Sequence, residues 1–210
     1  MILADNKQAR LHAAAIIRSG GVIAFRTDTF YGLGADPFNA GAIKRITELK
    51  GREEGKPTLI VLSEQAHISR FIAKPSKIFA CLAQHFWPGP LTLIGEAGPD
   101  VPKEITANSG TVGVRLPDDD EVRELISACG GALTATSANL SGQEPATSAQ
   151  QAEEYFGSRI DLVLDCGPAR SDRPSTVIET SGRVARLIRA GAILRAELDE
   201  RLAECGFESL

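Results

Sequence analysis

Short runs of branched apolar residues alternate with segments of helical periodicity, and this alternation constrains the fold more than any other feature of the sequence. From Ala9 to Ile17, apolar residues recur at helical spacing and stop at two glycines. A strand is expected next, at Val22 to Phe25. Asn39 is placed to cap a second helix, and Thr58 to Leu62 predicts the following strand. Such alternation is typical of layered α/β proteins.

The pattern continues to the end of the chain. Pro75 is expected in the first turn of a helix that ends near Phe86, where Trp87-Pro88-Gly89-Pro90 must break it. Further helices are expected at 118–128 and 193–204, and strands at 91–94, 111–114, 133–136, 162–164, 176–179 and 184–188. These strands and helices predict one α/β domain over residues 1–210, with a twisted, mixed open sheet and flanking helices.

Composition excludes several classes of protein. The chain has 210 residues, of which 43% are hydrophobic, and its formal charge of −4 argues against a dedicated nucleic-acid surface. No segment approaches the roughly 18 consecutive apolar residues of a membrane span, and the first residues do not resemble a secretory signal. A cytoplasmic protein with no membrane partner is therefore expected.

Cysteine and histidine spacing predicts no metal centre built by the protein. Cys81, Cys129, Cys166 and Cys205 stand alone in the sequence, without the close pairs of a zinc knuckle. They are interpreted as small buried hydrophobes in a reducing compartment. His12, His67 and His85 are equally scattered and show no metal-ligand spacing.

Common nucleotide-binding signatures are absent, although the chain is rich in glycine. Gly32-Leu33-Gly34 lacks the third glycine of a dinucleotide fingerprint. The segment from Gly51 to Pro57 is one residue too short for a P-loop and ends in proline, where serine or threonine should reach magnesium.

Polar loops that follow predicted strands carry the remaining functional signals, because open α/β sheets place ligands there. The segment 26–35 combines hydroxyls, a carboxylate and glycines, and is either a ligand loop or a tight turn with an Asx turn at Asp28. Lys50, Arg52 and Lys56 form either a phosphate clamp or a solvated helix end.

Three further segments allow the same two interpretations. Thr136 to Gly142 is a strand that runs into a polar elbow, whose Ser and Asn side chains either bind a ligand or satisfy turn backbone. Ser137 lacks the preceding glycine of a nucleophile elbow, so serine hydrolysis fits poorly. Arg115 and Arg189 each end a strand and are either ligand contacts or surface residues.

Taken together and in this order, these segments closely resemble the YrdC-like family of threonylcarbamoyl-AMP synthases. The matching blocks are spread over nearly the whole chain: Thr27 to Ala35, Lys50-x-Arg52, Trp87 to Thr92, Val112 to Arg115, Thr136 to Gly142, Ser175 to Val177 and Arg189-x-Gly191. The pairing of Lys50-x-Arg52 with Ser137-x-Asn139 is highly characteristic of this family.

The resemblance implies a nucleotidyltransferase that joins L-threonine, bicarbonate and ATP into threonylcarbamoyl-AMP and pyrophosphate. Magnesium would be held mainly by the ATP phosphates, with no metal site in the protein. The product would pass to a threonylcarbamoyl-transferase complex that modifies tRNA. Family members carry the site on the concave face of a twisted sheet, and longer members add a C-terminal domain that this chain is expected to lack.

The resemblance also implies residue roles. L-Threonine would be held by Thr29, Arg115, Ser137 and Ser175, and ATP by Arg52, Lys56, Thr111, Asn139, Thr147 and Arg189. Lys50 and Tyr31 would complete the pocket, and Lys50, Arg52, Ser137 and Asn139 would carry the catalytic role. No covalent nucleophile is expected, since positioning and electrostatic stabilisation suffice for this chemistry.

Three residues depart from the family's usual pattern, and two other functions stay open. Arg26 and Glu53 stand where proline is common, and Val61 where many members carry histidine near threonine. One alternative is an RNA-binding module of the same fold, with weak RNA binding; 16 of the 23 basic residues are arginine, but the net charge is acidic. The other is a divergent paralogue that uses a related carbamoyl adenylate.

Overall fold

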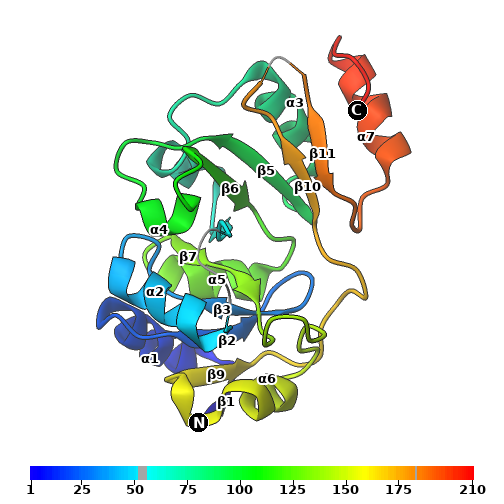
Figure 1. Cartoon of the computed structure of the whole chain (residues 1–210). Helices are drawn as coiled ribbons and strands as arrows, with labels where there is room; N and C mark the ends of the chain where they lie inside the picture. Colours follow the sequence, from blue (N-terminus) through cyan, green and yellow to red (C-terminus); the bar gives the residue numbers. More distant parts are fainter. Residues whose placement is uncertain (52–55, 183) are drawn as a thin grey trace.

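The strands of the computed structural model form two hydrogen-bonded sheets, which occupy the lower and upper parts of Figure 1. The structure describes residues 1–51, 56–182 and 184–210. The lower sheet is mixed and has the order β1-β9-β2-β3-β8, with β9 parallel to both β1 and β2 and with β3 antiparallel to its neighbours. Its strands are β1 (Ile2–Ala4), β2 (Ile23–Arg26), β3 (Tyr31–Gly34), β8 (Thr136–Ser137) and β9 (Leu162–Asp165).

The upper sheet is also mixed, with the order β11-β10-β5-β6-β4-β7. The pairs β10–β5 and β4–β6 are parallel, and the other neighbours are antiparallel. Its strands are β4 (Ile60–Leu62), β5 (Leu91–Glu96), β6 (Thr111–Arg115), β7 (Ala132–Thr134), β10 (Thr176–Glu179) and β11 (Arg186–Arg189). The expected α/β class with mixed strands and flanking helices is confirmed, although the strands divide between two sheets instead of forming one.

Helices cover both sheets (Figure 1), and their starts follow local capping. The helices are α1 (Lys7–Arg18), α2 (Ala40–Leu49), α3 (Lys77–Phe86), α4 (Lys103–Thr106), α5 (Asp120–Ala128), α6 (Ala149–Phe156) and α7 (Arg195–Glu204), with short 3₁₀ turns η1 (Gln65–Arg70) and η2 (Gly157–Arg159). Asn39 caps α2 as expected, since its Oδ1 accepts a hydrogen bond from the N–H of Ala42. In α3 the cap is Ser76, so Pro75 lies before the helix and not in its first turn.

One group of buried side chains joins the two sheets. Ile23 and Phe25 of β2 share a hydrophobic cluster with Val61 of β4 and Leu133 of β7, and all four are fully buried. Burial of each such side chain is worth about 1.5–3 kcal/mol, so this cluster holds the sheets in a fixed relation. Helices α1 and α5 contact each other beside it.

The chain crosses between the sheets where the sequence predicts one continuous strand. Residues 133–136 divide into the end of β7 in the upper sheet and the start of β8 in the lower sheet. Strand β3 was expected to be part of a loop, and β1 and α6 were not expected. No helix within the described ranges is long and apolar enough to cross a membrane.

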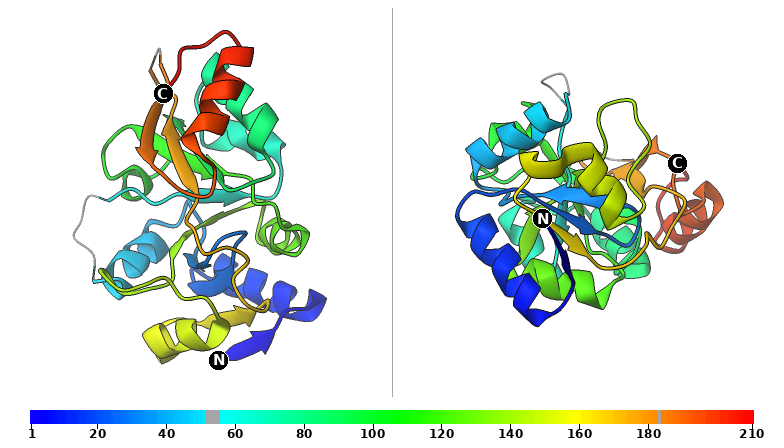
Figure 2. Two further views of the ribbon diagram at one scale, coloured as in Figure 1. Left: turned by 90° about the vertical axis from the view of Figure 1, so that its right-hand side faces the viewer. Right: turned by 90° about the horizontal axis from the view of Figure 1, so that it is seen from below.

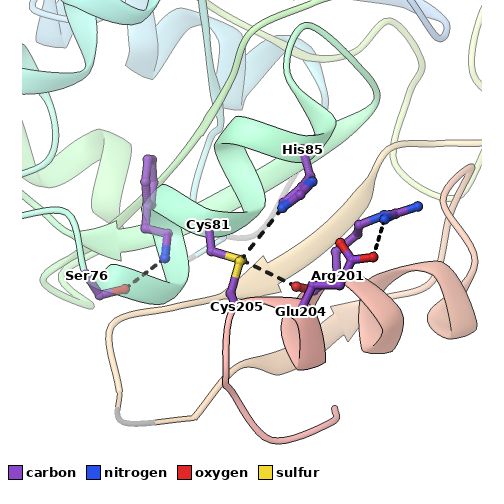
Figure 3. Close-up of a disulfide and its surroundings, with 7 residues drawn as sticks. Ser76, Cys81, His85, Arg201, Glu204 and Cys205 are labelled. Atoms are coloured by element: carbon purple, nitrogen blue, oxygen red, sulfur yellow. Dashed lines mark hydrogen bonds and ion pairs between the residues drawn. A yellow bond between two sulfur atoms is a disulfide. The ribbon is translucent and has the colours of Figure 1, made fainter.

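The expectation that all four cysteines are unpaired is wrong. Cys81 of α3 and Cys205, which caps the end of α7, form a disulfide across 124 positions of sequence (Figure 3). The left view of Figure 2 shows α7, in red, lying along α3. Cys129 and Cys166 are free and half-buried. Sequence spacing missed the disulfide because only the packing of α7 on α3 brings the two cysteines together.

Candidate active site

A cavity of about 410 Å³ lies between the two sheets and collects most of the residues singled out in the sequence. Its walls come from the β2–β3 loop, the segment after α2, strands β5, β6 and β10, and the elbow that follows β8. The expected site residues that line it are Thr29, Tyr31, Lys50, Lys56, Arg115, Ser137, Asn139, Ser175 and Arg189. Segments far apart in the sequence therefore meet in one hollow.

Arg115, at the end of β6, connects the upper sheet to the β2–β3 loop of the lower sheet. Its Nη1 donates to Thr29 Oγ1 at 3.4 Å, and its Nη2 lies 3.2 Å from Oδ1 of Asp28. Thr27 makes the turn, because its Oγ1 accepts from the N–H of Thr29 and donates to the carbonyl of Phe30. The Asx-turn interpretation of Asp28 is thus replaced by a buried ion pair with Arg115.

Arg189, at the end of β11, is held against Ser175 on the neighbouring segment. Its Nη2 donates to the carbonyl and to Oγ of Ser175 at 2.8 and 2.9 Å, and its Nε donates to the same carbonyl at 3.1 Å. Ser175 Oγ shares a further hydrogen bond of 2.9 Å with Thr92 Oγ1. Burial lowers the pKa of Arg189, and the nearby charge of Arg115 lowers it further.

Lys50 and the elbow after β8 form a second polar group on the cavity wall. The Nζ of Lys50 donates to the carbonyl of Ser137, and to the carbonyl and Oδ1 of Asn139 at 3.0 Å each. Ser137 Oγ donates to the same Oδ1 at 2.6 Å. The amide of Asn139 donates to the carbonyl of Gln143, which fixes its orientation. The pattern Lys50…Ser137-x-Asn139 is therefore one hydrogen-bonded unit.

Tyr31 lines the cavity from β3 while its hydroxyl is anchored on another loop. The hydroxyl donates to the carbonyl of Gly167 at 2.6 Å. Burial raises the pKa of Tyr31, so the hydroxyl keeps its proton and stays a donor. Tyr31 thereby ties β3 to the segment that follows β9.

The electrostatics of the cavity favour anions. Lys50, Lys56, Arg115 and Arg189 supply four cationic groups, and two guanidinium groups offer paired donors that suit carboxylate or phosphate oxygens. Among the described residues that line the cavity there is no aspartate or glutamate. Magnesium is usually held by one or two carboxylates together with substrate phosphates, and the described walls offer it no carboxylate.

Several expected site residues lie elsewhere. Thr111, at the start of β6, does not line the cavity, and its Oγ1 shares a hydrogen bond with Ser109. Thr147 lines a neighbouring hollow of about 450 Å³ that shares Phe30 and Pro145 with the cavity. Arg52 and Glu53 lie outside the described residues.

Two of the departures from the family pattern also lie away from the cavity. Val61 is fully buried against Val122 and Leu125 of α5. Arg26 is buried in an ion pair with Asp119, at 2.9 Å, and also contacts Glu121. Neither side chain lines the cavity, so neither departure changes its described walls.

The sequence did not indicate the roles of Asp28 and Thr92. Asp28 is the buried counterion of Arg115, and Thr92 supports Ser175. The sequence does carry a signal for Thr92, because this residue follows Pro90-Leu91 at the start of a predicted strand. In the structure, Thr92 is paired with Val177 of β10, two positions beyond Ser175. Asp28 carries no comparable local signal.

Comparison with known proteins identifies relatives over most of the chain. Residues 15–191 match the Sua5/YciO/YrdC family model, which carries the description "Telomere recombination". A threonylcarbamoyl-AMP synthase of Halorhodospira halophila is 36% identical over 184 residues, which are 88% of this chain and 92% of that protein. A threonylcarbamoyl-AMP synthase of Pyrococcus abyssi is 36% identical over 192 residues, 91% of this chain but 56% of that protein.

The same architecture occurs in a solved structure. The crystal structure of P. abyssi Sua5 complexed with L-threonine matches with a TM-score of 0.94 at 33% identity. The match covers 99% of this chain and 62% of that chain. This chain therefore spans less than two thirds of the Pyrococcus protein, and nearly the full length of the Halorhodospira relative.

Proposed function

Because this chain belongs to the Sua5/YciO/YrdC family, we propose that it is a threonylcarbamoyl-AMP synthase acting as a nucleotidyltransferase. It joins L-threonine, bicarbonate and ATP into threonylcarbamoyl-AMP and pyrophosphate. The observation that carries the proposal is the cavity that Arg115 and Arg189 line together with the hydrogen-bonded Lys50, Ser137 and Asn139. Two relatives named threonylcarbamoyl-AMP synthase are each 36% identical to this chain, over 184 and 192 residues.

The proposed chemistry requires fixed positive charge and little else from the protein. The threonine amine captures carbon dioxide as a carbamate, and a carbamate oxygen then attacks the α-phosphate of ATP while pyrophosphate leaves. Negative charge develops on the phosphate oxygens, where preorganised cations act most strongly. Lys50, held by carbonyls of the elbow, places one such charge at a fixed point. Magnesium, when bound to the triphosphate, neutralises further charge.

The threonine subsite is proposed at Arg115, with Thr29, Ser137 and Ser175 around it. Arg115 would pair with the threonine carboxylate through two parallel hydrogen bonds. The hydroxyls of Thr29 and Ser175 are fixed by Arg115 and by Arg189, so they offer oriented partners for a polar side chain. A polar partner is needed because an apolar pocket distinguishes threonine from valine poorly.

The nucleotide is proposed to lie along Lys50, Lys56, Asn139 and Arg189, with Tyr31 closing one wall. Arg52 is proposed as a phosphate ligand on the basis of its motif alone. Thr111 and Thr147 are proposed as ATP contacts on the same basis, from their positions in the family motifs. The product would be consumed by a threonylcarbamoyl-transferase complex that acts on tRNA in the cytoplasm.

The decisive experiment supplies purified protein with ATP, magnesium, bicarbonate and each amino acid in turn. Pyrophosphate release and the mass of the adenylate are measured together. The proposal requires both products with threonine and bicarbonate present, and neither when one of them is omitted. Pyrophosphate release with a different amino acid in place of threonine would overturn the threonine assignment. No pyrophosphate release from folded protein that binds ATP would overturn the proposed activity.

A further inference from the structure

A cluster of metal-binding side chains lies at the contact between α3 and α7, away from the cavity. It consists of Cys81, His85 and Cys205, whose ligand atoms all lie within 4.8 Å of one another (Figure 3). The described residues that line the cavity include none from α3 or α7. The proposed reaction gives this cluster no role.

The disulfide explains the two cysteines but not the histidine. His85 follows Cys81 by four positions on α3, so both side chains leave the helix on the same face. The imidazole points at the disulfide in Figure 3, and its Nε2 lies 3.8 Å from Cys205 Sγ. A nitrogen ligand is therefore already placed beside both sulfur atoms.

The proposed function places this enzyme in the cytoplasm, a reducing compartment that keeps cysteines as thiols. There the Cys81–Cys205 disulfide is expected to be reduced. Reduction by a dithiol breaks the Sγ–Sγ bond. Each cysteine sulfur gains one electron and one proton, and the dithiol is oxidised to its own disulfide. The products are two thiols beside one imidazole.

We propose that the reduced chain binds one Zn²⁺ through the thiolates of Cys81 and Cys205 and the imidazole of His85. Two Zn–S bonds form as the two thiol protons leave to solvent, and the imidazole donates its lone pair. Two cysteines and one histidine are an established zinc ligand set, in which water takes the fourth position. Exposure of His85 leaves that position open to solvent.

The geometry requires little movement. With Zn–S and Zn–N bonds of about 2.3 and 2.0 Å, tetrahedral ligands lie roughly 3.5–3.8 Å apart. The Cys205 Sγ–His85 Nε2 distance of 3.8 Å is close to the roughly 3.5 Å of such a sulfur–nitrogen pair, and all three ligand atoms lie within 4.8 Å of one another, so the main movement after reduction is separation of the two sulfur atoms. Zinc would then replace the disulfide as the link between α7 and α3, which are 124 positions apart at these cysteines.

The experiment uses the full chain, reduced with a dithiol that is then removed without air. Zn²⁺ is titrated against a chromophoric chelator, and Co²⁺ is added separately to record its absorption. We expect one Zn²⁺ per chain, a thiolate-to-cobalt charge-transfer band and the strong visible bands of tetrahedral cobalt. The oxidised chain, which keeps the same fold, should bind neither ion at this site.

Variants identify the ligands. Cys205→Ser and His85→Gln should each weaken Zn²⁺ binding by at least about tenfold, since even outer-shell partners are worth 10–100-fold. Cys166→Ser and His67→Gln, which change a cysteine and a histidine elsewhere, should bind as the parent chain does. Circular dichroism of each reduced variant checks that the fold is retained.

Three results would overturn the proposal. The reduced parent chain could bind no Zn²⁺ beyond the oxidised chain, Cys205→Ser could bind as tightly as the parent, or His85→Gln could leave both affinity and the cobalt spectrum unchanged. None of these measurements depends on threonylcarbamoyl-AMP synthesis. Failure of the zinc site and failure of the proposed activity are therefore separate outcomes.

Discussion

Arg115 Nη2 lies 3.2 Å from Asp28 Oδ1, and this ion pair joins the end of β6 to the β2–β3 loop. Both side chains are almost wholly buried, with 3% and 4% of their surface exposed. Neither carboxylate oxygen has a hydrogen-bond donor among the described residues, so the ion pair is the contact that offsets burial of Asp28.

Asp28→Asn should therefore destabilise the protein strongly. The amide keeps the shape of the side chain but leaves the Arg115 charge buried without its counterion, at a cost on the order of 3 kcal/mol. Urea unfolding measures the loss. Asp100→Asn, at an exposed aspartate, is the matched control and should change the free energy of unfolding little. Equal stability of the two variants would mean that the pair carries no net stabilisation.

Asn139→Ala should remove activity while the fold remains. The variant loses the Oδ1 that accepts hydrogen bonds from Lys50 and Ser137, so Lys50 keeps only its two backbone acceptors and Ser137 loses its partner. Turnover should fall at least about 100-fold, as it does when one preorganised stabilising group is lost. Gln143→Ala is the control, because Gln143 contributes its backbone carbonyl to this unit. Arg52→Ala is expected to match Asn139→Ala.

Arg189→Lys tests the wall formed by β11. Lysine keeps the charge but cannot reproduce the guanidinium hydrogen bonds to the carbonyl and Oγ of Ser175. The KM for ATP should rise about tenfold, a loss of roughly 1.4 kcal/mol. Arg186→Lys, on the same strand but not among the residues that line the cavity, controls for the substitution itself. A parental KM in Arg189→Lys would remove this residue from the nucleotide subsite.

The two free thiols predict a loss of stability at high pH. Burial raises the pKa of Cys129 and of Cys166 to about 12, from an ordinary value of 9.0. The folded chain therefore keeps protons that the unfolded chain has lost between these two values. The stabilisation is complete below pH 9.0 and is lost as the pH rises toward about 12. Urea unfolding across this range should show a shallower decline in the double variant Cys129→Ala/Cys166→Ala.

Element types were largely predictable from the sequence, and β3 shows where propensity fails. Gly32 and Gly34 argue for a loop, because glycine is a poor strand former. Yet a Cβ at Gly34 would lie 2.6 Å from the ring of Phe25, and one at Gly32 would lie 3.3 Å from the carbonyl of Thr136. The glycines are needed because neighbouring strands approach closely, which is a tertiary fact.

Helix α6 has a local signal at its start. Ser148 accepts a hydrogen bond from the N–H of Gln151, and Ser-x-x-Gln is a recognised start of a helix. Strand β1 had none, since three exposed or half-exposed residues carry no clear pattern. The disulfide likewise depends on contacts that no local window contains.

The site shows the same division. The family resemblance implies a joint role for Lys50, Ser137 and Asn139, and the structure brings them into one hydrogen-bonded unit. The counterion role of Asp28 was missed, because the ion pair depends on how β6 lies relative to the β2–β3 loop. Motifs shared with a family thus indicate which polar side chains meet around the cavity, whereas the pairing of one side chain with another across the two sheets depends on tertiary structure.

The parallel pairing of β1 with β9 also sets the order of events during synthesis. Strand β1 is made first, but its partner ends at Asp165. At about 5–20 residues per second, roughly 8–30 s pass before that partner exists. Strand β1 stays unpaired on this side for all of that time, so the lower sheet is completed only after Asp165 has been synthesised.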